Sequence, residues 1–333
     1  MRTTPAPAPE STGSLGRMAR GGERWLRRHL LDPTHPIAAI EVRSRSIGVV
    51  RLAREGRRLS LGAAASLDLP EGAVRVSMTQ PNVTDAAAFR DTLRSALERA
   101  GALHVGRVAL VLPDPVARLA LMPGSEVAAK RRKQSEELIR FRLRKAVPFD
   151  VRDARVAFAG GGPRAADSVL VAAVYLPVLE SYEEACRAVG LQPGLVELSG
   201  LALLNAAFGS RPSADRLLIN WDEDYVTLLL ARGEWPMLVR TLAGEAAASP
   251  DEVAREVGNT ILYYRERLGG NVLAQAVVRS ALLPPDEAIR RLEGPLEIKP
   301  EILEPWSALR AGEMSQVGQS LAGAAACLVG SRR

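Results

Sequence analysis

Residues 37–52 read IAAIEVRSRSIGVVRL, and this stretch decides the fold class. Apolar Ile40 and Val42 alternate with charged residues, a polar pair at Ser44 and Arg45 follows, and the apolar run then resumes. This pattern predicts two strands joined by a tight turn. A third strand is expected behind them over residues 59–69.

The same arrangement is written again at residues 217–242, LLINWDEDYVTLLLARGEWPMLVRTL, where three more strands are expected. Each triplet is followed by an amphipathic helix and a short apolar strand. In the first half these are a helix capped by Thr84 and a strand at 107–113; in the second, a helix opened by Pro250 and a strand at 272–278. Such an internal repeat predicts two related α/β lobes that face each other.

The composition sets outer limits on the protein. The chain has 333 residues, of which 47% are hydrophobic and only 4% aromatic, so its cores must consist mainly of Leu, Val and Ala. Two cysteines, Cys186 and Cys327, provide neither a disulfide framework nor a metal site, which fits a reducing cytoplasm. No apolar run approaches the ~20 residues that span a bilayer.

Residues 1–36 are expected to form a disordered, basic N-terminal arm. Residues 1–33 hold six arginines against three acidic residues, a net +3 and half of the formal charge of +6, so the rest is only mildly basic. This balance argues against nucleic acid as a partner. The apolar residues around Trp25 admit two interpretations: a helical lead-in packed on the domain, or a basic amphipathic helix on an anionic membrane surface.

The middle of the chain interrupts the first lobe. Residues 116–122 are expected to pair with the strand at 107–113, and residues 125–147 to form one long helix that Pro148 ends. The expected boundaries are an arm at 1–36, the first part of the first lobe at 37–133, an inserted α+β subdomain at 134–194, a return helix at 195–214, the second lobe at 215–315 and a closing helix at 316–333.

Residues 40–50 form the first hairpin, residues 139–150 read IRFRLRKAVPFD, and residues 218–222 begin the second hairpin, with a helix over 256–267 behind it. In order and spacing these stretches resemble the PilM family of actin-like type IV pilus assembly proteins, relatives of the cell-division protein FtsA. The Val-Pro-Phe segment resembles the Ile-Pro-Phe-Pro end of a family helix at the entry to an inserted subdomain. The resemblance covers nearly the whole chain from about residue 37.

The resemblance implies a two-lobed actin-like fold, a duplicated ribonuclease H-like α/β unit with a small α+β subdomain inserted in the first lobe. It implies a non-enzymatic cytoplasmic scaffold, peripheral at the inner membrane, that binds the N-terminal cytoplasmic tail of a PilN-like membrane protein and links it to pilus motor components. The implied groove lies between the first lobe and the inserted subdomain, and its candidate lining residues are Leu138, Phe141, Arg142, Lys145, Pro148 and Phe149. Ordinary packing between subdomains is the alternative interpretation of Leu138, Phe141 and Phe149.

The nucleotide positions of the family are changed in this chain. Actin-like ATPases hold phosphates with two Asp-x-Gly turns, in which glycine lets backbone N–H groups approach and aspartate handles the metal-bound water. The corresponding phosphate and adenosine positions here are Glu41, Arg43, Ser44, Asn220, Asp222, Arg279 and Ser280. Bulky or charged side chains in these places favour loss of nucleotide binding, so no cofactor and no metal are expected.

Two alternatives stay open at this point: a GspL-like cytoplasmic component of a type II secretion platform, which shares the fold, and an actin-like ATPase that retains nucleotide. Outside the nucleotide positions, the sequence shows no recognisable set of catalytic residues. His29, His35 and His104 are dispersed, and none has a Ser or Cys partner in a recognisable elbow.

The two hairpin turns are expected to face each other across the cleft of this fold. Arg43 would then lie within salt-bridge distance of Asp222, directly or through one water, and would hold the lobes closed without nucleotide. An exposed pair contributes at most ~1 kcal/mol. Burial would make the removal of one partner cost several-fold more.

Overall fold

The computed structural model describes residues 35–55, 58–127, 132–160, 168–208, 214–233, 235–308 and 318–330. The described residues from Pro36 onward form one compact unit. The predicted arm lies outside the described residues except for its last two positions, and the same holds for parts of the predicted closing helix, at 316–317 and 331–333.

The first lobe contains a five-stranded sheet of order β3-β2-β1-β4-β8. Its strands are β1 Ala38–Val42, β2 Ser46–Glu55, β3 Arg58–Asp68, β4 Arg107–Leu112 and β8 Gln192–Leu198. The β1–β2 hairpin is antiparallel, whereas β4 runs parallel to β1 on its other side. Every residue of β1 is buried, because helices cover both faces of this central strand.

The second lobe repeats this plan in a sheet of order β11-β10-β9-β12-β13. Its strands are β9 Asp215–Trp221, β10 Tyr225–Arg232, β11 Trp235–Ala243, β12 Gln275–Ser280 and β13 Glu301–Ile302. Again an antiparallel hairpin is followed by a parallel strand on the far side of its first strand. The predicted repeat of three strands, a helix and a strand is therefore confirmed.

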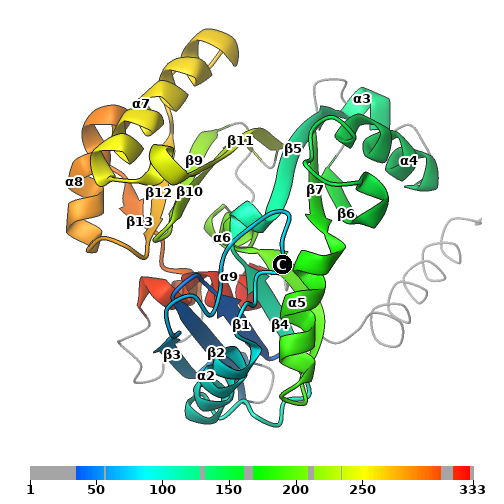
Figure 1. Cartoon of the computed structure of the whole chain (residues 1–333). Coiled ribbons are helices and arrows are strands. Elements are labelled where there is room, and N and C mark those ends of the chain that lie inside the picture. The colour runs from blue at the N-terminus through cyan, green and yellow to red at the C-terminus, as the bar shows by residue number, and fades with distance from the viewer. Residues whose placement is uncertain are drawn as a thin grey trace, which may run out of the picture. The chain divides into compact units, whose positions relative to one another are not determined.

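Each sheet has its own helices on the outer face and shares a helical layer on the inner face (Figure 1). The outer helices are α2 Ala86–Arg99 and α5 Leu176–Arg187 in the first lobe, and α7 Pro250–Arg267 and α8 Pro285–Leu296 in the second. The carboxylate of Asp85 caps α2 by accepting hydrogen bonds from the backbone N–H groups of Ala87 and Ala88, so the predicted cap at Thr84 is wrong by one residue.

The inner layer consists of α6 Ser199–Ala207 and α9 Ala322–Gly330, which pack on each other. Residues 322–329 of α9 are all buried, and most are Ala or Gly, so the helix approaches its neighbours closely. One apolar cluster joins α6 and α9 to both sheets through residues such as Val111 and Leu218. The two lobes therefore share a core as well as facing each other.

The inserted subdomain is a three-stranded antiparallel sheet of order β5-β7-β6 with two short helices. Its elements are β5 Ala117–Pro123, α3 Gly124–Val127, α4 Arg132–Leu143, β6 Ala154–Gly160 and β7 Ser168–Tyr175. Figure 1 shows α3 and α4 on the side of this sheet that faces away from the first lobe.

Three predictions about this region are wrong. Residues 117–123 pair with β7 rather than with β4, because β4 already has β1 and β8 on its two edges. The insertion therefore spans about 117–175 instead of 134–194, and α5 and β8 belong to the first lobe. In place of one helix over 125–147, the structure has α3 and α4, with residues 128–131 between them outside the described part.

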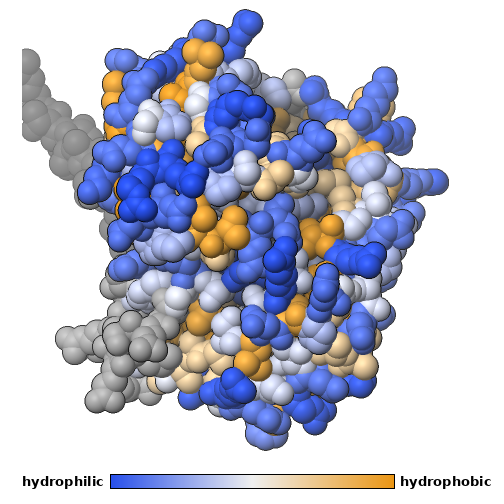
Figure 2. All heavy atoms as spheres, turned by 60° about the vertical axis from the view of Figure 1, so that its left-hand side comes forward, coloured by the Kyte–Doolittle hydropathy of each residue, from blue (hydrophilic) through white to orange (hydrophobic). Residues whose placement is uncertain are grey.

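Short 3-10 turns complete the chain: η2 Asp114–Val116, η3 Val151–Asp153, η4 Gly244–Ala247, η5 Pro305–Ala308 and η6 Gln319–Leu321. None of the helices in the described ranges is long and apolar enough to cross a membrane. On the face shown in Figure 2, the hydrophobic side chains of the described residues form separate small spots among hydrophilic ones.

Candidate functional site

The turns of the two long hairpins meet between the lobes. Arg43 leaves the β1–β2 turn, and its Nε lies 3.2 Å from Oδ1 of Asp222 in the β9–β10 turn. The same guanidinium also donates to the carboxylate of Glu223. The predicted pair of Arg43 and Asp222 is thus present, direct and buried, with side chains 4% and 3% exposed.

A second arginine, Arg279 at the end of β12, completes the contact and is fully buried. Its Nη2 lies 3.0 Å from Oε1 of Glu41 in the first lobe. In the second lobe its Nη1 donates to Asp222 and, at 3.2 Å, to Oδ1 of Asn220. Its Nε donates to the carbonyl oxygen of Gln319, 3.0 Å away. One guanidinium therefore bridges carboxylates of both lobes.

Two carboxylates of the chain lie at the N-termini of the inner helices. The backbone N–H of Ala324 in α9 donates to Oε2 of Glu41 at 2.9 Å, and that of Gly200 in α6 donates to Oδ1 of Asp114 at 2.7 Å. A Cβ on Gly323 or Gly200 would lie 2.5 Å or 2.6 Å from these carboxylates, so glycine is required for the close approach. Helix N-termini are favourable sites for anions, including phosphates; here side chains of the protein occupy them.

Asp114 is a member of this cluster that the sequence analysis missed. It follows β4, is fully buried, and accepts a hydrogen bond of 2.9 Å from Nδ2 of Asn220 across the lobe interface. Asn220 also contacts the hydroxyl oxygen of Ser199 at 3.3 Å. The available signal was its position: Asp114 comes just after a strand parallel to β1, so it lies at the same sheet end as the hairpin turn.

The remaining predicted positions lie beside the cluster. The hydroxyl of Ser280 donates to the carbonyl oxygen of Leu283 and accepts from its backbone N–H, which stabilises the turn after β12. The hydroxyl of Ser44 is buried and has no hydrogen-bond partner among the described residues. We refer below to Glu41, Arg43, Asp114, Asn220, Asp222, Glu223 and Arg279 as the interlobe cluster.

The carboxyl groups of the interlobe cluster differ in how they ionise. Burial opposes ionisation of Asp222, but Arg279 and Arg43 outweigh it and lower its pKa to about 2. Burial dominates at Glu41 and Asp114 and raises the pKa of each above its usual value, although Arg279 at Glu41 and the Gly200 N–H at Asp114 act in the opposite direction. Arg43 and Arg279 therefore lie beside one carboxyl group whose pKa is lowered and two whose pKa values are raised.

The six residues predicted to line a partner groove differ in burial. Leu138 and Phe149 are half-buried against the core of the inserted subdomain, and the Phe149 ring stacks on Tyr175 with centroids 5.1 Å apart. The remaining four are Phe141, Arg142, Lys145 and Pro148, which are exposed. Lys145 and Pro148 follow α4, which ends at Leu143, and Tyr175, the stacking partner of Phe149, also packs against the core of the first lobe. The groove between the first lobe and the inserted subdomain stays a prediction.

Metal binding receives no support from the part of the chain that the structure describes. No group of three or more His, Cys, Asp or Glu residues in it could hold a metal ion. Cys186 is buried, and burial raises its pKa to about 12, as expected for a core thiol rather than a reactive one.

By sequence, no protein-family model and no curated protein matches the chain. By structure, it is similar to the PilM-PilN type IV pilus biogenesis complex, with a TM-score of 0.72 and 20% identity over 90% of this chain and 98% of that one. It is also similar to a Bacteroides thetaiotaomicron protein with an actin-like ATPase fold and unknown function, at TM-score 0.50 and 10% identity over 80% of this chain and 90% of that one.

The fold is actin-like. At these identities the likeness shows the architecture alone. A weaker likeness, to the cytoplasmic domain of EpsL from the type II secretion system of Vibrio cholerae, has a TM-score of 0.45 and 13% identity over 74% of this chain and 83% of that one. That score is too low to support an argument about this protein.

Asp222→Asn should destabilise the protein strongly. Asp222 is shared by two buried arginines, and its loss leaves buried cations without their main partner, which typically costs about 3–5 kcal/mol. The matched control is Asp224→Asn in the same turn, whose partner Arg45 is 3.7 Å away and 75% exposed; this change should cost at most ~1 kcal/mol. Denaturant unfolding at pH 7 measures both, and equal losses would contradict the role assigned to Asp222.

The interlobe cluster should make stability depend on pH in two opposite ways. Asp222, with its pKa lowered to about 2, stabilises the fold above its unfolded pKa of about 3.9, and this contribution is lost as pH falls towards 2. Glu41 and Asp114, with raised pKa values, stabilise the fold at low pH, and their contribution is lost as pH rises through the folded pKa. The unfolding free energy, measured by denaturant unfolding across the pH range, should therefore fall below about pH 4 because of Asp222. It should also decline as pH rises above about 4 because of Glu41 and Asp114.

Two variants test which residue causes each change of stability with pH. Asp222→Asn should reduce the loss of stability below about pH 4, and Glu41→Gln should reduce the loss as pH rises above about 4, whatever either change costs in absolute stability. Profiles with the wild-type slopes in both variants would remove these residues from the explanation.

Proposed function

We propose that this protein is a non-enzymatic, PilM-like scaffold of a type IV pilus assembly platform, cytoplasmic and peripheral at the inner membrane. The proposal is supported by the likeness to the PilM-PilN complex, which extends over 98% of that chain. In this role the protein would bind the N-terminal tail of a PilN-like membrane protein and connect it to motor components. Residues 1–36 would provide any contact with lipid.

The proposal that the protein is not an enzyme rests on the interlobe cluster. By resemblance, Arg43 stands at a phosphate position of actin-like ATPases and Arg279 at an adenosine position, and both already contact carboxylates of the protein. The N-terminus of α9 is occupied by Glu41 and that of α6 by Asp114. A nucleotide would have to displace these groups, bring its own negative charge beside Asp222, and leave buried charges unpaired. Each of these steps is unfavourable.

ATP with magnesium should therefore give neither a thermal shift nor a calorimetric signal at millimolar concentration. A ligand that binds only the folded state raises its stability by mass action, so binding at 100 times Kd would add about 2.7 kcal/mol and be easily seen. Magnesium chloride without ATP is the control. A saturable ATP signal would contradict the loss of nucleotide binding and leave the pilus assignment to be judged by its partner.

The partner surface is best sought on α4. Phe141 is 65% exposed, the guanidinium of Arg144 lies 5.6 Å from its ring centre, and Arg142 and Lys145 are exposed nearby. A large exposed aromatic among cations is suited to an anchor for a short peptide. Phe149 is less suitable for a test, because its half-buried ring helps to pack the subdomain.

A peptide copying the N-terminal cytoplasmic tail of the PilN-like protein encoded beside this one should bind with a Kd of about 1 μM or lower, or about −8 kcal/mol. Phe141→Ala should weaken binding at least 10-fold without changing the melting temperature, because the ring is mostly exposed. Leu262→Ala on α7, at a side chain 55% exposed, is the matched control and should bind normally. Fluorescence anisotropy measures all three proteins.

If the Phe141→Ala variant binds the tail peptide as tightly as the wild type does, the tail binds somewhere other than α4. A tail peptide that does not bind the wild type would contradict the proposed partner itself.

A further inference from the structure

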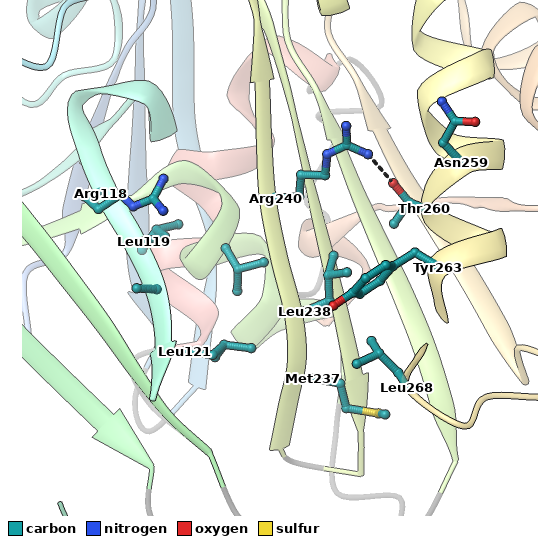
Figure 3. A pocket seen from close by; sticks show the side chains of 12 residues that line it. Arg118, Leu119, Leu121, Met237, Leu238, Arg240, Asn259, Thr260, Tyr263 and Leu268 are labelled. Carbon is teal, nitrogen blue, oxygen red and sulfur yellow. Dashed lines mark hydrogen bonds between the residues drawn. The ribbon is translucent and has the colours of Figure 1, made fainter. Parts of the chain in front are cut away.

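A groove of about 610 Å³ lies between the inserted subdomain and the second lobe. One wall is residues 118–121 of β5 and the other is residues 237–240 of β11, with α7 and Leu268 at its side (Figure 3). This volume is within the usual range for ligand sites. We call it the edge-strand groove.

Both walls are edge strands. Among the described strands, β5 pairs with β7 alone and β11 with β10 alone. No strand pairing joins β5 to β11 in the described part of the chain, although the two strands face each other and run in opposite directions (Figure 3). Cα atoms of β5 and β11 already approach within 8 Å, so a further strand at its usual spacing of about 4.8 Å from each does not fit between them. An extended peptide would lie along the two strands and contact mainly their side chains.

The side chains of the edge-strand groove are mainly apolar. Leu119 and Leu121 come from β5, and Met237 comes from the start of β11. Tyr263 leans from α7 towards β11 and is 49% exposed, although it is large and mostly apolar (Figure 3). Exposed aromatic rings beside apolar pockets are common anchors for bound peptides.

The charges in the groove have one sign. Its lining includes two arginines and no acidic residue. Arg240 is already held by Glu256 at 2.5 Å and by the hydroxyl of Thr260 at 3.0 Å. Arg118 is exposed and has no ion pair or hydrogen bond among the described residues. The groove therefore has an uncompensated positive charge at the Arg118 end.

We propose that the edge-strand groove binds an extended peptide segment of another protein, apolar at alternate positions and with a carboxylate that pairs with Arg118. Four facing residues on each wall give a contact of about 13 Å at 3.3 Å per residue, enough for about four residues of strand. The arginine-rich N-terminal arm of the chain has the wrong charge to meet Arg118. The proposal does not depend on the pilus assignment.

A random twelve-residue peptide display library, selected on the full-length protein, provides the test. Enriched peptides should carry Asp or Glu beside alternating apolar residues. Their fluorescent synthetic forms should lose affinity at least 10-fold in Arg118→Glu, a reversal of charge at an exposed position. The matched control is Arg155→Glu on β6, the opposite edge of the same sheet, where the side chain is also exposed; it should bind as the wild type does. Leu121→Asp should also abolish binding.

The proposal is overturned if no peptide is enriched, if the enriched peptides lack an acidic residue, or if they bind Arg118→Glu and Arg155→Glu equally. Light scattering distinguishes another occupant: a dimer of the wild type that Arg118→Glu abolishes would assign the groove to a second copy of the chain. Peptide binding that appears only after deletion of residues 1–34 would assign it to the arm. Either result would also overturn the proposal.

Discussion

The pairing of Arg279 with Glu41 and Asp222 is the interaction on which the arrangement of the lobes depends. Burying the guanidinium groups of Arg279 and Arg43 away from water costs free energy. Carboxylates offset that cost only when all of the ion pairs and hydrogen bonds are formed. These contacts form only when both hairpin turns and the end of β12 meet. The first turns of α6 and α9 must also supply N–H groups to Asp114 and Glu41. A different angle between the lobes would leave buried charges unpaired.

The same cluster changes what the actin-like architecture can do. In this fold two related lobes create a cleft between hairpin turns, and here that cleft is closed by the protein's own charged side chains. The shared apolar core around α6 and α9 acts in the same direction, because opening the lobes would expose it to water. The two binding surfaces that we propose lie away from this cleft: α4 of the inserted subdomain, and the groove between β5 and β11.

Much of the fold, and one contact of the interlobe cluster, could be predicted from local sequence patterns. Alternating residues around polar turns predicted both β-hairpins, and the repeated order of elements predicted the two lobes. Because the hairpins of a duplicated fold face each other, the contact between Arg43 and Asp222 followed from their positions in the turns. The pairing of β5 could not be obtained in this way, since a seven-residue apolar strand is compatible with any free sheet edge. Only the assembled sheet shows that β8 takes the edge of β4.

The sequence by itself therefore determined the elements, their duplication and the charged residues at the cleft, because each is encoded within a few neighbouring positions. Apart from the pair of Arg43 and Asp222, tertiary structure alone decided which of those charges meet. Glu41 and Arg279 are 238 positions apart, and Asp114 and Asn220 are 106 apart. It also decided that Phe141 is exposed while Phe149 packs inward, although both belong to one predicted motif. Burial and long-range pairing depend on how elements pack in space, and no local pattern of residues contains that information.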